Sequence, residues 1–211
     1  MPLIKIDQIN KNRAVALWNI TESLEQLLAM RALSKYDREL YNKYTHDEKK
    51  REWLTGRLLL KSLAEEMNLH FNGVLRDENG KPCLIDHDAE VSLSHSYPYV
   101  AAIIDRKEQV GIDLEQPKEK LKKIAGRFLN AKELEFVGDD IKMLCICWCA
   151  KETLYKIYSQ RGLAFREEMH IEPFELKESS LFNGNILANG SAKRYTLRYI
   201  VAADYILTFN E

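Results

Sequence analysis

The sequence predicts an α+β protein made of two similar halves. Segments in which apolar and polar residues alternate are typical of strands, and longer segments carry apolar residues at helical spacing. A weak internal repeat relates the halves, because displacing the chain by 95 positions brings Trp53 onto Trp148. We therefore expect an N-terminal half over residues 1–105 and a C-terminal half over residues 106–211.

The first half is expected to hold one long helix and a tight turn. Its apolar residues recur with helical spacing from Asp47 onward, and Asp47 can cap this helix. Asn79 and Gly80 both tolerate positive φ, so they predict a turn. The expected elements are strands over 14–20 and 91–104, helices over 35–45 and 47–68, and a short paired segment over 82–85.

The second half begins with a strand that carries two acids. Val110, Ile112 and Leu114 alternate with polar residues, so Asp113 and Glu115 point to one face. The expected elements are strands over 109–115 and 194–209, and helices over 117–127, 131–137 and 142–158. On the last helix, Trp148, Glu152 and Lys156 recur every four residues along one stripe.

Three carboxylates and one ammonium can therefore converge, namely Asp113, Glu115, Glu152 and Lys156. Hard oxygen ligands of this kind suit Mg²⁺, which also accepts phosphate oxygens from a substrate. Each motif alone has a structural alternative. Two acids on a strand are commonly a solvated sheet face, and Glu152 with Lys156 is a common surface pair worth about 0.2 to 0.5 kcal/mol.

Five motifs occur in a recognisable order over residues 79–163. They are Asn79-Gly80-Lys81-Pro82, Ser92-Leu93-Ser94-His95-Ser96, Gly111-Ile112-Asp113-Leu114-Glu115, Phe128-Leu129-Asn130-Ala131-Lys132-Glu133, and the helix segment from Trp148 to Lys156. Together they resemble the 4'-phosphopantetheinyl transferases, specifically the longer type that activates surfactin synthetase. Residues 1–45 and 164–211 match this family only in length and general pattern.

The resemblance implies the 4'-phosphopantetheinyl transferase fold, with two α+β halves related by a pseudo-twofold axis and one active cleft. It implies Mg²⁺-dependent transfer of the phosphopantetheine arm of coenzyme A to a serine of an apo acyl or peptidyl carrier protein, with release of 3',5'-ADP. The 95-residue shift places Trp18, Ile20 and Arg57 where the second half has its three acids. We therefore expect only one metal site.

The resemblance also assigns roles to individual residues. It makes Asp113, Glu115 and Glu152 the metal ligands, with Glu152 and Lys156 as the catalytic residues. The residues expected to bind coenzyme A are Lys81, Ser94, His95, Arg51, Arg57 and Lys156. From periodicity alone, His95 would instead be a core histidine and Lys81 an exposed turn lysine. Lys151 points about 100° away from Glu152 on the helix, so we assign it only a supporting role.

Composition favours a globular protein of the cytoplasm, and the resemblance implies that it acts as a monomer whose two halves form a pseudo-dimer. The chain has 211 residues, 45% of them hydrophobic, and its net charge of −1 gives no sign of nucleic-acid binding. No apolar run predicts a membrane span or a secretion signal. Cys145, Cys147 and Cys149 lie on one predicted helix without a second ligand pair, so buried cysteines are expected rather than zinc.

The sequence departs from the family pattern at residues 159–163, where only the later of two usual glycines is present. The metal site is expected to be unaffected, whereas the preference for carrier or coenzyme is expected to depend on this loop. The lysine-rich region 117–137 can dock an acidic carrier helix, although a solvated helix face explains it equally well. Two other functions are considered. The first is another Mg²⁺-dependent phosphotransferase or a nucleotide hydrolase, which would require a phosphate-binding glycine loop that this sequence lacks. The second is a catalytically silent homologue that binds coenzyme A or a carrier.

Overall fold

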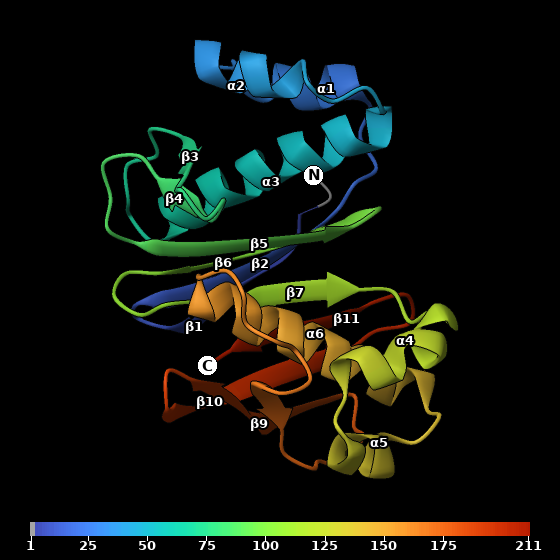
Figure 1. The fold of residues 1–211 in the computed structure, drawn as a ribbon. Helices are drawn as coiled ribbons and strands as arrows, with labels where there is room; N and C mark the ends of the chain where they lie inside the picture. Colours follow the sequence, from blue (N-terminus) through green and yellow to red (C-terminus); the bar gives the residue numbers. More distant parts are fainter. Residues whose placement is uncertain (1–2) are drawn as a thin grey trace. The chain divides into compact units, whose positions relative to one another are not determined.

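The computed structural model describes residues 3–211 and confirms a mixed fold of helices and two antiparallel sheets (Figure 1). The chain forms two compact units. The first unit runs to Arg76 and also includes Pro82–Glu108, and the second includes Asp77–Lys81 and Gln109–Glu211.

The first unit is a six-stranded sheet covered by helices, with strand order β1-β2-β6-β5-β4-β3. Its strands are β1 (Leu3–Asn10), β2 (Arg13–Asn19), β3 (Val74–Arg76), β4 (Pro82–Leu84), β5 (Glu90–Ser96) and β6 (Tyr99–Asp105). Its helices are α1 (Leu24–Ala29), α2 (Lys35–Tyr41) and α3 (Asp47–Glu66). The long helix α3 packs on β6, β2 and β5. Its Leu59, Leu60 and Leu63 are fully buried in the core of this unit.

The second unit is a five-stranded sheet with strand order β7-β11-β10-β9-β8. Its strands are β7 (Ile112–Glu115), β8 (Met169–Ile171), β9 (Ser179–Ala188), β10 (Ser191–Val201) and β11 (Ile206–Asn210). Its helices are α4 (Lys120–Phe128), α5 (Ala131–Val137) and α6 (Ile141–Tyr158). Among residues 3–211, the short strand β7 lies at the edge of this sheet and pairs with β11.

Helix α6 lies unusually close to the start of β7, at Gly111. A Cβ added to Gly111 would lie 2.2 Å from the Thr153 carbonyl oxygen and 2.9 Å from Ile157 Cγ1. Real Cβ atoms do not approach a backbone oxygen so closely, so only glycine permits this packing. The Thr153 hydroxyl also donates to the Thr208 carbonyl at 3.0 Å, which joins the helix to β11. These contacts fix the distance between β7 and the residues next to Thr153.

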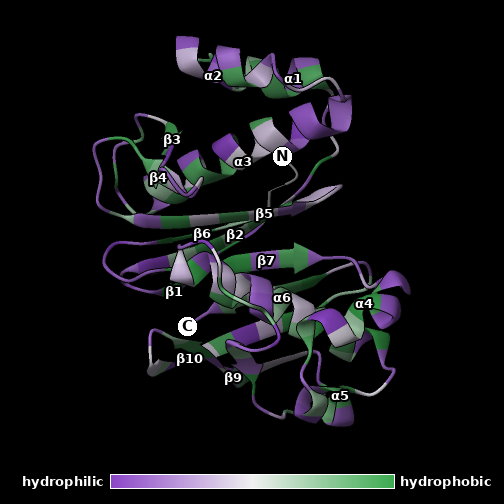
Figure 2. Cartoon of the chain, viewed as in Figure 1, coloured by the Kyte–Doolittle hydropathy of each residue, from purple (hydrophilic) through white to green (hydrophobic). Residues whose placement is uncertain are grey.

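Helix α4 has one apolar side and one polar side. In Figure 2, α4 shows hydrophilic residues interspersed with hydrophobic ones. Leu121, Ala125 and Phe128 form its buried side, and the lysines between them are exposed. Within residues 3–211, no helix combines the length and apolarity that crossing a membrane requires.

Several expected boundaries were wrong. Residues 91–104 form two strands separated at Tyr97 and Pro98, and residues 194–209 likewise form two strands. Asp47 is the first residue of α3 and not its cap, since His46 occupies the cap position without a side-chain hydrogen bond. The elements that the sequence analysis did not identify are α1, β1, β3, β8 and β9.

Substitution of Gly111 by alanine is expected to destabilise the protein by about 3 kcal/mol or more, because the added methyl group forces β7 and α6 apart. Urea unfolding followed by circular dichroism measures this loss. Gly126→Ala is the matched control on α4, where an added Cβ meets no atom within 4 Å. It should be neutral or stabilising by about 0.5 to 1 kcal/mol. Equal stability of the two variants would contradict the packing argument.

Candidate functional site

The two acids of β7 occupy different environments on the same strand face. Asp113 is 5% exposed, and Glu115 is partly exposed at the end of the strand. Their backbone positions are set by pairing with Thr208 and Ile206 of β11. Because Asp113 and Glu115 are two residues apart, their side chains point to the same side of the sheet.

Helix α6 brings Lys156 and Glu152 to this acidic strand. The Lys156 ammonium donates to Asp113 Oδ1 and to the Ile112 carbonyl, both at 2.8 Å. Burial and the negative charges of Asp113 and Glu115 raise the pKa of Glu152 to about 7, although the Lys156 charge opposes the shift. A carboxyl group with this pKa can accept or release a proton near neutral pH.

The candidate metal ligands do not form a closed cluster. Within residues 3–211, no group of three His, Cys, Asp or Glu side chains is arranged to hold a metal ion. Two features nevertheless fit a hard divalent cation. The donors are all carboxylate oxygens, which Mg²⁺ prefers. Burial first, and then the charges of Asp113 and Glu115, raise the pKa of Glu152, and a bound cation would offset those two charges.

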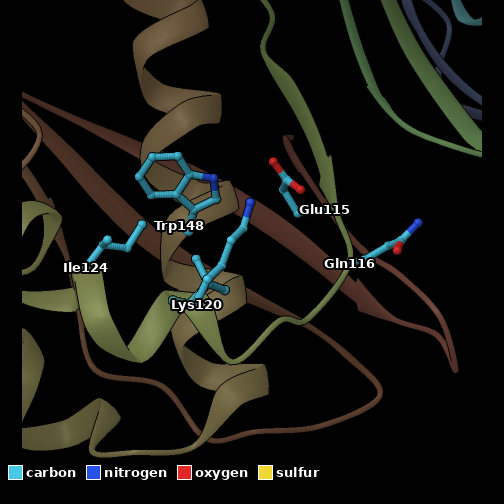
Figure 3. Close-up of a pocket in the computed structure, with 6 residues that line it drawn as sticks. Glu115, Gln116, Lys120, Ile124 and Trp148 are labelled. Atoms are coloured by element: carbon cyan, nitrogen blue, oxygen red, sulfur yellow. The ribbon is translucent and has the colours of Figure 1, made fainter. Parts of the chain in front are cut away.

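A small pocket of about 50 Å³ adjoins Glu115. It is lined by Glu115, Gln116, Lys120, Leu121, Ile124 and Trp148. Figure 3 shows the amino group of Lys120 extending toward the space between the Trp148 ring and Glu115, whereas Gln116 points away from them. The pocket therefore has an apolar wall and a charged rim beside the acidic strand.

In the first unit, His95 is exposed and Arg51 is partly exposed. The His95 side chain is 50% exposed at the end of β5, so it is not a core histidine. Arg51 Nη1 donates to the Tyr97 hydroxyl at 3.1 Å. Ser94 is buried, in contrast with its neighbour His95. The structure thus leaves the imidazole within reach of a ligand, whereas the Ser94 side chain is buried.

Arg57 does not belong to this surface group, contrary to our expectation. Its guanidinium lies 3.8 Å from the centre of the Trp53 ring, and its Nε donates to Asp37 Oδ1 at 3.3 Å. Burial lowers the pKa of Arg57, although Asp37 opposes the shift. The side chain is almost fully enclosed, so Arg57 acts as a packing residue between α2 and α3.

Lys81 lies on the turn between β3 and β4. The Asp77 carboxylate organises this turn by accepting hydrogen bonds from the backbone of Asn79 at 2.9 Å and of Lys81 at 2.8 Å. Gly80 has a φ of +88°, as expected from the Asn-Gly pair.

The segment 159–163, which departs from the family pattern, begins with Ser159. This residue caps α6 with a φ of +58°.

Sequence reasoning underestimated Lys151. Its ammonium is fully buried and donates to Glu133 Oε2 at 2.7 Å and to the carbonyls of Phe128 at 2.6 Å and Phe165 at 2.9 Å. Glu133 in turn accepts the backbone N–H of Ile171 at 2.7 Å. This network joins α4, α5, α6 and β8 next to Glu152. The Lys151-Glu152 pair in the sequence motif could have indicated a role for Lys151, but a fully buried lysine is rarely predicted from sequence alone.

Comparison with known proteins agrees with the motifs. Residues 109–209 match the model of the 4'-phosphopantetheinyl transferase superfamily. The 4'-phosphopantetheinyl transferase HetI of Nostoc sp. is 30% identical over 178 residues, which cover 74% of this chain and 73% of that protein. A holo-[acyl-carrier-protein] synthase of Staphylococcus epidermidis is 29% identical over 119 residues, which cover 50% of this chain and 97% of that protein.

A third relative, described as a putative 4'-phosphopantetheinyl transferase of Haemophilus influenzae, is 28% identical over 105 residues. The aligned region covers 46% of this chain and 45% of that protein, so the chain spans less than half the length of this relative.

Replacing Lys151 by methionine is expected to destabilise the protein by about 3 to 5 kcal/mol, since it leaves the Glu133 carboxylate buried without its cation. Urea unfolding measures this change in the free energy of unfolding. The control is Lys142→Met on the exposed side of α6, for which the change should stay within about 0.5 kcal/mol. A loss below about 1 kcal/mol for Lys151→Met would mean that the network does not hold the helix.

Proposed function

Because the chain belongs to the 4'-phosphopantetheinyl transferase superfamily, we propose that it transfers the phosphopantetheine arm of coenzyme A to a serine hydroxyl of an apo acyl or peptidyl carrier protein. In this reaction the serine oxygen forms a bond to the phosphorus that carries the pantetheine arm. The anhydride P–O bond breaks, and 3',5'-ADP leaves with the bonding electrons. The serine proton must pass to a base.

The second unit supplies the reacting groups in this proposal. Asp113, Glu115 and Glu152 would hold Mg²⁺, which offsets the charge of the coenzyme diphosphate when bound. Glu152 takes up the serine proton directly or through a water molecule, as a positioned carboxylate can. Lys156 contacts the same diphosphate and offsets the charge that develops on the departing ADP.

The first unit and the β3–β4 turn supply the coenzyme contacts. His95 and Arg51 are surface cations or hydrogen-bond donors suited to phosphate oxygens. Ser94 can contribute through its backbone, since its side chain is buried. Lys81 binds the nucleotide end of the coenzyme from the turn. Arg57 has no part in this proposal because its side chain is enclosed by Trp53 and Asp37.

The carrier protein is proposed to dock on the basic side of α4. Carrier proteins present an acidic helix, and exposed basic residues attract and orient such a partner. The exposed basic residues on or next to α4 are Lys118, Lys120, Lys122, Lys123 and Arg127. The pocket beside Glu115 begins at this surface, since Lys120 lines it.

The observation that carries the proposal is the contact of Lys156 with Asp113 at 2.8 Å, next to Glu152, whose pKa is raised by burial and by the charges of Asp113 and Glu115. An ordinary surface pair would join Lys156 to Glu152, its neighbour on the helix. Here the ammonium instead crosses from α6 to the acidic strand, where it lies next to a carboxylate proposed to hold the cation.

The transfer is tested by incubating the protein with apo acyl carrier protein, coenzyme A and Mg²⁺, and measuring the intact mass of the carrier. We expect the mass of one phosphopantetheine arm to be added. Glu152→Gln should lower the transfer rate by about 10² to 10⁴, the range for loss of a positioned base. The control Glu135→Gln removes an exposed acid on α5 and should leave the rate unchanged.

Two results would contradict the proposal. The first is coenzyme A binding without any modification of several acyl and peptidyl carriers, which would identify a silent binding homologue. The second is a Glu152→Gln variant that transfers at the unmodified rate under saturating Mg²⁺.

A further inference from the structure

A buried carboxylate lies behind the surface imidazole of the first unit. Glu52, on the second turn of α3, is only 3% exposed. Its Oε2 lies 3.3 Å from His95 Nδ1 and accepts a hydrogen bond from Lys49 Nζ at 2.6 Å. Both partners reach solvent, because the side chains of Lys49 and His95 are 53% and 50% exposed.

The fold directs His95 toward this carboxylate. Leu93 shares a strand face with His95, and its methyl groups lie 3.6 Å from the position of a Cβ on Gly56 of α3. Gly56 follows Glu52 by four residues, so the two lie on the same side of the helix. Strand β5 runs along this side of α3. His95, two residues after Leu93, therefore lies next to Glu52, which is one helical turn before Gly56.

The energetics require Glu52 to keep its partners. A carboxylate removed from water is costly unless it is paired and hydrogen-bonded. Burial alone raises the pKa of Glu52, but the hydrogen bonds and charges of His95 and Lys49 outweigh it and lower the pKa overall. The ionised carboxylate therefore holds two solvent-reaching nitrogen groups side by side. Its contact with Nδ1 leaves Nε2 as the ring nitrogen that a ligand can meet.

We propose that Glu52 is a positioning residue, which holds the His95 imidazole with its Nδ1 proton toward α3 so that Nε2 faces a phosphate of coenzyme A. This inference rests on the proposed function for the identity of the ligand. The arrangement resembles the way in which a carboxylate behind a metal-binding histidine fixes the tautomer and ring orientation. Glu52 itself does not touch the coenzyme.

A double-mutant cycle tests whether Glu52 acts through His95. Calorimetry measures the affinity of the whole chain for coenzyme A and for 3',5'-ADP. Glu52→Gln keeps the shape of the side chain and should weaken binding about tenfold, as loss of such a supporting carboxylate does elsewhere. In the His95→Ala background, the same substitution should have almost no further effect, because the ring that Glu52 orients is gone.

The control is Glu48→Gln, which removes an exposed acid from the first turn of the same helix. It should leave both affinities unchanged. A tenfold loss for Glu48→Gln would mean that overall charge, and not ring orientation, decides the affinity. The proposal would also be overturned if Glu52→Gln lowered the affinity equally in the presence of His95 and in the His95→Ala background.

Nitrogen NMR of the His95 ring provides a readout that does not depend on catalysis. The neutral ring should carry its proton on Nδ1 in the unmodified protein, and this preference should weaken in Glu52→Gln. A proton on Nε2 in the unmodified protein would refute the positioning role. If the NMR result and the binding cycle both hold but no carrier is modified, the proposed transfer fails while Glu52 retains its role in coenzyme binding.

Discussion

The close approach of α6 to β7 at Gly111 is the constraint on which the candidate site depends. The distance of 2.2 Å from a hypothetical Cβ to the Thr153 carbonyl leaves no room for any side chain at position 111. Glu152 precedes Thr153, and Lys156 follows one turn later, so the same contact sets both side chains against the acidic strand. A strand at the edge of its sheet thereby gains a rigid neighbour, which is the support that a precisely arranged site needs.

Each unit has a buried charged residue next to a residue of the candidate site. Lys151 is enclosed next to Glu152 and ties the helix to Glu133, while Glu52 is enclosed behind His95. Such charges add little net stability when correctly paired, but removing one partner is costly. Lys151 ties the part of α6 that carries Glu152 to Glu133 and to the carbonyls of Phe128 and Phe165. In the first unit, Glu52 is proposed to hold the ring of the exposed His95.

Much of the site could be predicted from the sequence because it depends on local periodicity. The two-residue spacing of Asp113 and Glu115 and the four-residue spacing of Glu152 and Lys156 follow from strand and helix geometry. Partners that depend on tertiary packing could not be predicted. Arg57 carries a guanidinium group, which commonly binds phosphate, yet this group packs against Asp37 and Trp53. Strand β9 contains Ser, Asn and Gly, which disfavour strands, and it forms because β10 pairs along its whole length.

The central claim is that the acids of β7 and α6 together bind one divalent cation with the coenzyme diphosphate. Electron paramagnetic resonance of Mn²⁺, which takes the same oxygen ligands as Mg²⁺, measures this binding directly in the presence of coenzyme A. We predict one bound ion per chain, with an affinity at least about tenfold weaker in Asp113→Asn. An unchanged Mn²⁺ affinity in a folded Asp113→Asn variant would contradict the account.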